Sequence, residues 1–213
     1  MDESTNGIIL RIRPLTETSL IVHWLTEDLG RVATVAKGAR RPKSKLHGKL
    51  DLFFEADFTF ARSRRSDLHN LRELQLKNVN SELRKSLHKI EQLSYFTTMI
   101  EQTTEVDTPI PETHRLFRSV LNHLVTHPPQ PRLVFAFELK HLYDLGLAPD
   151  PADSKLSPAG AELASQLIAE DWVGIAKLST TAATARELQQ FLHGFLIYHL
   201  DRLPKRRSMA LKT

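Results

Sequence analysis

Cysteine is absent from this 213-residue sequence, which excludes disulfide bonds, thiol catalysis and any cysteine-ligated zinc or iron–sulfur site. The sequence also lacks an apolar run of about 18 residues, so we expect no membrane-spanning helix. Residues 1–4 are acidic and lack the apolar stretch of a signal peptide, and we therefore expect a cytoplasmic protein. The composition, with 41% hydrophobic and 25% charged residues, is that of a globular protein and excludes bulk disorder.

The motifs of common enzymes are missing as well. Gly48-Lys49 is followed by Leu50 rather than by Ser or Thr, so it does not end a phosphate-binding loop. Neither Gly-x-Gly-x-x-Gly nor His-Glu-x-x-His occurs. His123 and His127 could share a metal on one helix face, but their place at a helix end favours an interaction with the helix dipole. We therefore expect no catalytic residue, no cofactor and no bound metal, and a hydrolase is the least favoured function.

Positive charge is concentrated in the first 80 residues, which hold 14 basic and 10 acidic residues. Residues 37–49 contain one histidine, no acidic residue and six basic residues: Lys37, Arg40, Arg41, Lys43, Lys45 and Lys49. A second basic group lies in the following connection and consists of Arg62, Arg64 and Arg65. Local blocks of this kind suggest a polyanionic partner, most simply a nucleic acid, with a solvated charged loop as the alternative.

The first part of the chain has the pattern of short β-strands. Apolar and polar residues alternate over 50–60, which indicates a strand with one buried face. Five strands are expected, over residues 7–13, 20–26, 31–36, 50–60 and 68–76. Five short strands fit a small barrel, and the oligonucleotide-binding (OB) fold is its commonest nucleic-acid-binding form. Trp24 shares the parity of the apolar strand residues and is expected in the core. Phe53 is the better candidate for an exposed aromatic residue, with a place at the junction with the helical part as the alternative.

After residue 80 the apolar period becomes helical. Helices are expected over 83–100, 112–125, 132–145 and 159–169, and a polar loop over 149–158. A capping box formed by Thr184 and Glu187 predicts a last helix. Its buried residues are expected to be Leu188, Phe191, Leu192, Phe195 and Leu196. We therefore predict an α+β protein, with an OB-fold barrel over residues 1–79 and an all-α domain over residues 80–213.

An ordered set of motifs over residues 17–53 resembles the RecO family of bacterial recombination mediators and DNA repair proteins. The set comprises Glu17-Thr18-Ser19-Leu20, Leu25-Thr26-Glu27, Gly30-Arg31-Val32, Val35-Ala36-Lys37-Gly38-Ala39-Arg40, Ser44, Gly48-Lys49-Leu50 and Phe53. Fainter similarity is carried by Phe137-Glu138-Leu139, Leu145-Gly146-Leu147 and the closing segment 203–209. The resemblance implies the same division into an OB fold and a helical domain.

The resemblance also implies a function without nucleotide cofactors. Family members bind single- and double-stranded DNA, anneal complementary strands and, with RecR, help RecA to displace the single-stranded-DNA-binding protein SSB. The resemblance thus implies a cytoplasmic, nucleoid-associated protein with these partners. Lys37, Arg40 and Lys49 stand at positions that match the family motif, so the resemblance implies that these three residues contact DNA. The same role for Arg41, Lys43, Lys45 and the group at 62–65 is inferred from charge alone.

Two features depart from the family pattern. Many members have four zinc-binding cysteines where this chain has residues 149–158, so we expect no zinc. Some members carry a basic residue just before Phe-Glu-Leu for docking the acidic, apolar SSB tail, but Phe135 and Ala136 stand here. Arg132 and Lys140 are the nearest candidates for that contact, and an ordinary solvated helix face is the alternative.

Two function classes other than a strand-annealing mediator stay open. One is an adaptor whose barrel and helices recruit protein partners, with nucleic-acid binding incidental. The other is an RNA-binding OB module. Competition between single-stranded RNA and DNA separates the RNA-binding module from the mediator, and strand annealing separates the adaptor from it.

Overall fold

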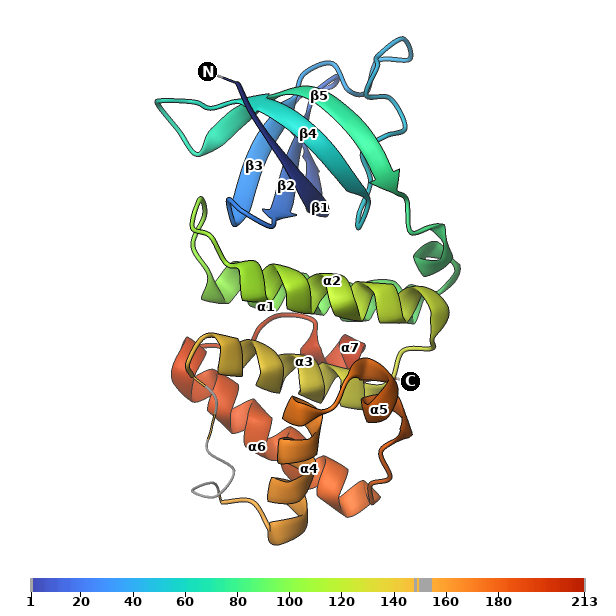
Figure 1. Cartoon of the computed structure of the whole chain (residues 1–213), viewed down its shortest axis with the longest axis vertical. Coiled ribbons are helices and arrows are strands. Elements are labelled where there is room, and N and C mark those ends of the chain that lie inside the picture. Colours follow the sequence, from blue (N-terminus) through green and yellow to red (C-terminus); the bar gives the residue numbers. More distant parts are fainter. Residues whose placement is uncertain (1, 148, 150–154, 213) are drawn as a thin grey trace. The chain divides into compact units, whose positions relative to one another are not determined.

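A computed structural model describes residues 2–147, 149 and 155–212 and divides the chain into two compact units (Figure 1). The first unit comprises Met1–Ser81 together with Thr104–Arg115, and the second comprises Glu82–Thr103 together with Leu116–Thr213. The first is a β-barrel and the second is helical, which confirms the predicted fold class. Residues 150–154 of the polar loop expected over 149–158 lie outside the described residues.

Five strands form the barrel: β1 (Asp2–Pro14), β2 (Leu20–Thr26), β3 (Arg31–Ala36), β4 (Glu55–Ala61) and β5 (Leu68–Asn78). Their order is β1-β2-β3-β5-β4, and the pairing of β1 with β4 closes the barrel. The pairing of β3 with β5 is parallel, and the other pairings are antiparallel. A closed five-stranded sheet in this order has the topology of an OB fold.

Alternation along the strands fills the barrel with apolar side chains. In β4 the residues Ala56, Phe58 and Phe60 are buried, while the residues between them are half-buried. Trp24 is fully buried, as predicted, and its ring stacks on Phe58 with 4.1 Å between ring centroids. The indole N–H donates to Thr34 Oγ1 at 2.9 Å, so the polar atom of this large core residue is satisfied.

The prediction that a strand runs from residue 50 and exposes Phe53 is wrong. Strand β4 begins at Glu55, and Phe53 has a positive φ of 64° and is only 1% exposed. The Phe53 N–H donates to Ile9 O at 2.8 Å, and the Phe53 carbonyl accepts from Asn80 Nδ2 at 2.7 Å. This left-handed turn breaks the alternation and places the ring inside, so Phe53 offers no surface for stacking a base.

The helices begin with the short 3-10 helix η1 (Ser81–Lys85). In the part of the chain that the structure describes, seven α-helices follow: α1 (Leu87–Thr103), α2 (Pro111–Thr126), α3 (Pro131–Asp144), α4 (Pro158–Ala169), α5 (Trp172–Lys177), α6 (Ala182–Leu200) and α7 (Arg207–Ala210). Helix α3 is the core of the helical unit, because it is buried on nearly every side over residues 133–139. Its Phe137 stacks on Phe96 of α1 with 4.1 Å between centroids. Among the described residues, no helix is long and apolar enough to cross a membrane.

The prediction that Thr184 and Glu187 form the capping box of α6 is wrong. Thr181 caps α6, and its hydroxyl accepts the N–H of Thr184 at 3.1 Å. Glu187 instead accepts from the backbone N–H of Ser157 at 2.6 Å and from its hydroxyl at 2.7 Å. Since Ser157 is the N-cap of α4, Glu187 completes a capping arrangement on a different helix.

The predicted burial of α6 is confirmed in part. Leu188, Leu192 and Leu196 are fully buried, whereas Phe191 and Phe195 are only half-buried. The two phenylalanines form a second stripe beside the leucines, at the edge of the face that packs on the unit. The helix therefore contributes its leucines to the core and leaves its aromatic rings partly in solvent.

A buried ion pair anchors the C-terminal helix α7. Arg207 donates from Nε to Glu138 Oε1 at 2.6 Å and from Nη2 to Glu138 Oε2 at 2.9 Å. The Tyr95 hydroxyl donates to the same carboxylate at 2.5 Å, and burial together with that charge raises the pKa of the phenol. Gln92 Nε2 donates to Ala210 O at 3.1 Å and so ties α1 to the same segment. Arg207, a basic residue of the closing segment 203–209, is therefore part of the core.

Candidate nucleic-acid interface

The basic loop, residues 37–49, follows strand β3 as a series of tight turns. Gly38 begins the first turn. Its φ of +64° is a backbone conformation that residues with a side chain rarely adopt. Backbone bonds at 2.9 to 3.1 Å then recur three residues apart, from Ser44 to Arg41, from His47 to Ser44 and from Lys49 to Leu46. The loop is thus an ordered series of turns.

Apolar residues hold this loop on the barrel while its cations face solvent. Ala39 is 4% exposed and belongs to the barrel core, and Leu46 and Leu50 pack against that core. All six predicted basic residues are exposed, namely Lys37, Arg40, Arg41, Lys43, Lys45 and Lys49. Within residues 2–147, 149 and 155–212, none of the six forms an ion pair. Their charges are therefore available to a polyanion.

A cleft of about 390 Å³ lies at the root of the basic loop. It is lined by Leu15, Thr16, Thr18, Ser19, Val35, Lys37, Gly38 and Arg41. The β1–β2 connection supplies one side, and the end of β3 with the first turn of the basic loop supplies the other. The arrangement combines two cations, three hydroxyl groups and two apolar side chains around one hollow.

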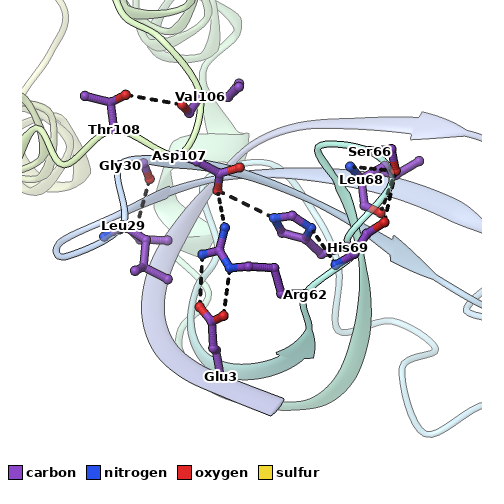
Figure 2. A network of polar contacts seen from close by, with 12 residues as sticks. Glu3, Leu29, Gly30, Arg62, Ser66, Leu68, His69, Val106, Asp107 and Thr108 are labelled. Atoms are coloured by element: carbon purple, nitrogen blue, oxygen red, sulfur yellow. Dashed lines mark hydrogen bonds and ion pairs between the residues drawn. The ribbon is translucent and has the colours of Figure 1, made fainter. Parts of the chain in front are cut away.

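The second basic group, in the β4–β5 connection, is partly committed to internal pairing (Figure 2). Arg62 donates to both carboxylate oxygens of Glu3, at 2.7 and 2.9 Å, and to Asp107 Oδ1 at 3.2 Å. Hydrogen bonding from Arg62 lowers the pKa of Glu3. Arg64 and Arg65 are exposed. Charge alone suggested DNA contact for all three residues, but Arg62 is neutralised by its partners, whereas Arg64 and Arg65 form no ion pair with any described residue.

His69 and Asp107 complete the network around Arg62 (Figure 2). The His69 ring is buried, stacks on Phe60 with 5.2 Å between centroids and accepts the Ser63 N–H at Nδ1. Its Nε2 lies 3.5 Å from Asp107 Oδ1. The Asp107 N–H donates to Arg31 O at 2.9 Å, so the segment between α1 and α2 is bound to β3. No local sequence signal predicted this network.

The structure does not bring the two basic groups together. In the parallel pair, Ala33 of β3 lies opposite Leu68 at the start of β5. The connection over 62–67 therefore lies toward the beginning of β3, whereas Lys37 follows the end of β3. In Figure 1 the two loops leave the barrel on different sides. The basic loop is thus the principal candidate surface and the 62–67 connection is a separate one.

Arg132 and Lys140, the predicted SSB-tail contacts, occupy different environments on α3. Arg132 donates to the carbonyls of Leu178 and Ala176. It also borders an apolar cavity of about 170 Å³ whose other lining residues are Pro131, Phe135, Leu163, Leu167, Leu178, Thr180 and Ala185.

Lys140 binds the end of another helix instead. Its ammonium donates to Ile168 O, near the end of α4, and lies 5.9 Å from the centroid of the Trp172 ring. Burial lowers the pKa of Lys140. The residues that line the apolar cavity include Arg132 and not Lys140.

The histidine pair at the end of α2 has a packing role. The His123 and His127 rings stack in parallel with 4.2 Å between centroids, and burial lowers the pKa of His123. In the part of the chain that the structure describes, no three side chains of the metal-ligating types form a group.

An OB barrel that presents an exposed basic loop and continues into a helical unit is an architecture used by nucleic-acid-binding proteins. The family description "Recombination protein O N terminal" matches residues 1–80, and "Recombination protein O C terminal" matches residues 84–154. The chain belongs to the RecO family of DNA repair proteins.

Several curated relatives carry the name "DNA repair protein RecO". The chain is 30% identical over 145 residues to that of Syntrophus aciditrophicus, and the match spans 68% of this chain and 56% of the relative. Identity to that of Alkaliphilus metalliredigens is 24% over 233 residues, spanning 93% and 94%. Identity to that of Idiomarina loihiensis is 33% over 144 residues, spanning 68% and 61%. Two of these three matches therefore cover less than two thirds of the relative.

Proposed function

We propose that this chain is a non-enzymatic recombination mediator that binds DNA and anneals complementary single strands. With RecR, it assists the loading of RecA on SSB-coated strands. The observation that carries the proposal is the basic loop, in which six exposed cations without ion-pair partners in the described residues stand on an OB barrel. The names of the curated relatives, as DNA repair proteins, support the same conclusion.

The charge of the basic loop explains how such a protein promotes annealing. Lysine and arginine side chains that contact phosphates release condensed counterions, which makes binding favourable and dependent on salt. The same charges reduce the repulsion between two strands held near the loop. Phosphate contacts also leave the base edges free to pair. Annealing by this mechanism needs neither a nucleotide nor a catalytic group.

The apolar cavity beside Arg132 supports a contact with the SSB tail. That tail is acidic and apolar, so it needs an apolar pocket with a cation at its edge. Phe135 and Leu163 line the cavity, and the Arg132 guanidinium borders it. We assign the tail contact to Arg132, whereas Lys140 is bound to the end of α4 and stabilises the helical unit.

Annealing of two complementary strands coated with the cognate SSB, measured without ATP at low and moderate salt, tests the proposal. We expect acceleration that decreases as salt increases. Combined substitution of Lys37, Arg40 and Arg41 by glutamate should abolish it. A matched control reverses three exposed cations of the helical unit that neither line nor flank the Arg132 cavity in sequence, Arg202, Lys205 and Lys212, and should keep the activity.

The outcomes separate the two parts of the proposal. Acceleration with naked strands but not with coated strands would leave DNA binding in place and contradict the SSB contact, which Arg132→Ala tests directly. No acceleration with either substrate would overturn the mediator function and favour an adaptor that recruits proteins.

A further inference from the structure

The cleft at the root of the basic loop has a chemistry that phosphate binding alone does not require. Leu15 lies in its lining and is 45% exposed, so it presents apolar surface beside two cations. Val35, which is 9% exposed, contributes a second apolar surface. Lys37 and Arg41 lie on the same cleft. A ligand that satisfies this lining must carry negative charge and an apolar face close together.

The two sides of the cleft are joined by hydrogen bonds, so the hollow exists before a ligand binds. The Gly38 N–H donates to Ser19 Oγ at 3.3 Å, and the Arg40 N–H donates to Thr18 O at 3.0 Å. Within the β1–β2 connection, Thr16 Oγ1 accepts from the N–H groups of Thr18 and Ser19 at 3.3 and 3.0 Å. A preformed site loses less entropy on binding than a flexible loop does.

We infer that this cleft is a subsite for one nucleotide of an unpaired DNA strand. The inference rests on the proposed function and specifies the form of DNA that the site prefers. The base lies on Leu15, and the adjoining phosphate lies between Lys37 and Arg41. The hydroxyl groups of Thr16 and Ser19 supply further hydrogen bonds to the backbone of the strand.

Leu15 distinguishes a single strand from a duplex because of what each form exposes. In B-form DNA the faces of the bases are covered by stacking, and a protein reaches phosphates and groove edges only. An unpaired strand can turn a base face toward an apolar surface, and OB folds bind single strands through such contacts. The cations of the loop therefore bind the phosphates of both forms, whereas Leu15 contacts a base of the single strand alone.

Substitution of Leu15 by serine tests this inference in the full chain. Binding is measured by fluorescence anisotropy with an oligothymidylate and with a mixed-sequence duplex of the same length, over a series of salt concentrations. We expect single-strand affinity to fall about five- to tenfold, the order expected for losing part of a buried leucine surface. Duplex affinity and both salt slopes should not change.

Three further variants control the measurement. Val173→Ser removes an apolar side chain of similar exposure, 43%, from α5 and should alter neither affinity. Lys37→Ser should weaken both forms and reduce the salt slope on the single strand by about 0.7. Leu15→Phe should strengthen single-strand binding, because a ring stacks on a base better than an aliphatic side chain does.

The results discriminate between this inference and the proposed function. Loss of single-strand affinity alone in Leu15→Ser supports the subsite. Equal weakening of both forms, or no change in either, overturns the subsite while leaving DNA binding by the loop intact. If the unsubstituted protein binds neither form of DNA, the proposed function fails and the subsite fails with it.

Discussion

Arg62 donates a hydrogen bond to Asp107 at 3.2 Å, although 45 positions separate the two residues in the chain. The same guanidinium holds both oxygens of Glu3, so it joins the first strand, the β4–β5 connection and the segment between α1 and α2. A cation with two carboxylate partners has little net charge to offer a phosphate. Arg62 is therefore a structural residue of the barrel unit. Arg64 and Arg65, its neighbours in sequence, are exposed instead.

Substitution of Arg62 and of Arg64 by glutamine should give opposite results. Arg62→Gln is expected to lower the free energy of unfolding by about 1 kcal/mol, since it breaks a partly exposed ion-pair network, and to leave the salt dependence of DNA binding unchanged. Arg64→Gln should not change stability and should reduce the salt slope. Urea unfolding and DNA titrations measure the two effects. An equal loss of salt slope in both variants would contradict the structural role of Arg62.

Replacement of Gly30 by alanine should be far more harmful than replacement of Gly48. Both glycines have a positive φ, +71° and +72°, which costs an alanine about 1–2 kcal/mol. A Cβ at Gly30 would also lie 1.8 Å from Thr108 O, whereas nothing lies within 4 Å at Gly48. We expect Gly30→Ala to cost about 3 kcal/mol or more in thermal unfolding. Faster hydrogen exchange at the Asp107 amide should accompany it, because the segment must move away from β3.

Breaking the buried pair of Glu138 and Arg207 should destabilise the protein strongly. Glu138→Gln leaves the Arg207 guanidinium, which is 3% exposed, without a countercharge, and we expect a loss of about 3–5 kcal/mol. The double variant Glu138→Leu with Arg207→Met should be more stable than Glu138→Gln, because no buried charge is left unpaired. The exposed pair Arg115–Glu112 provides a control, where Glu112→Gln should change stability by less than about 1 kcal/mol. A double variant less stable than Glu138→Gln in urea unfolding would contradict the interpretation.

His141 should make the folded protein less stable as the pH falls from about 6.5 to about 4. Burial lowers the pKa of His141 to about 4, and its Nε2 lies 2.7 Å from Thr103 Oγ1. In this window the unfolded chain binds a proton that the folded chain does not, so the free energy of unfolding decreases by about 3 kcal/mol toward the acid end. Urea unfolding across this range measures the slope. His141→Gln should reduce it, leaving the contribution of His123, whose pKa is also lowered by burial, and His193→Gln should not change it. The same slope in His141→Gln would assign it to other groups.

The sequence was sufficient to predict features that depend on neighbouring residues. Alternation of apolar residues predicted strands, and a period of 3.6 predicted helices, because each pattern follows from the geometry of one element. The basic loop was visible because its six cations are close together in the chain. The burial of Trp24 followed from the parity of its strand.

Other features were decided by the tertiary structure, because they join residues that are far apart in the chain. Phe53 turns inward through a positive φ, and its carbonyl is held by Asn80, which no local alternation reveals. Glu187 binds the N-cap residue of a helix, Ser157, which lies 30 positions before it. Arg62 donates its hydrogen bond to Asp107 only when the barrel has formed.

The cleft beside the basic loop likewise needs two connections, 15–19 and 37–41, that the closed barrel brings together. A local pattern determines which residues share a face of one strand or helix. Only the packing of the whole chain determines which charges are paired and which are left exposed for a ligand.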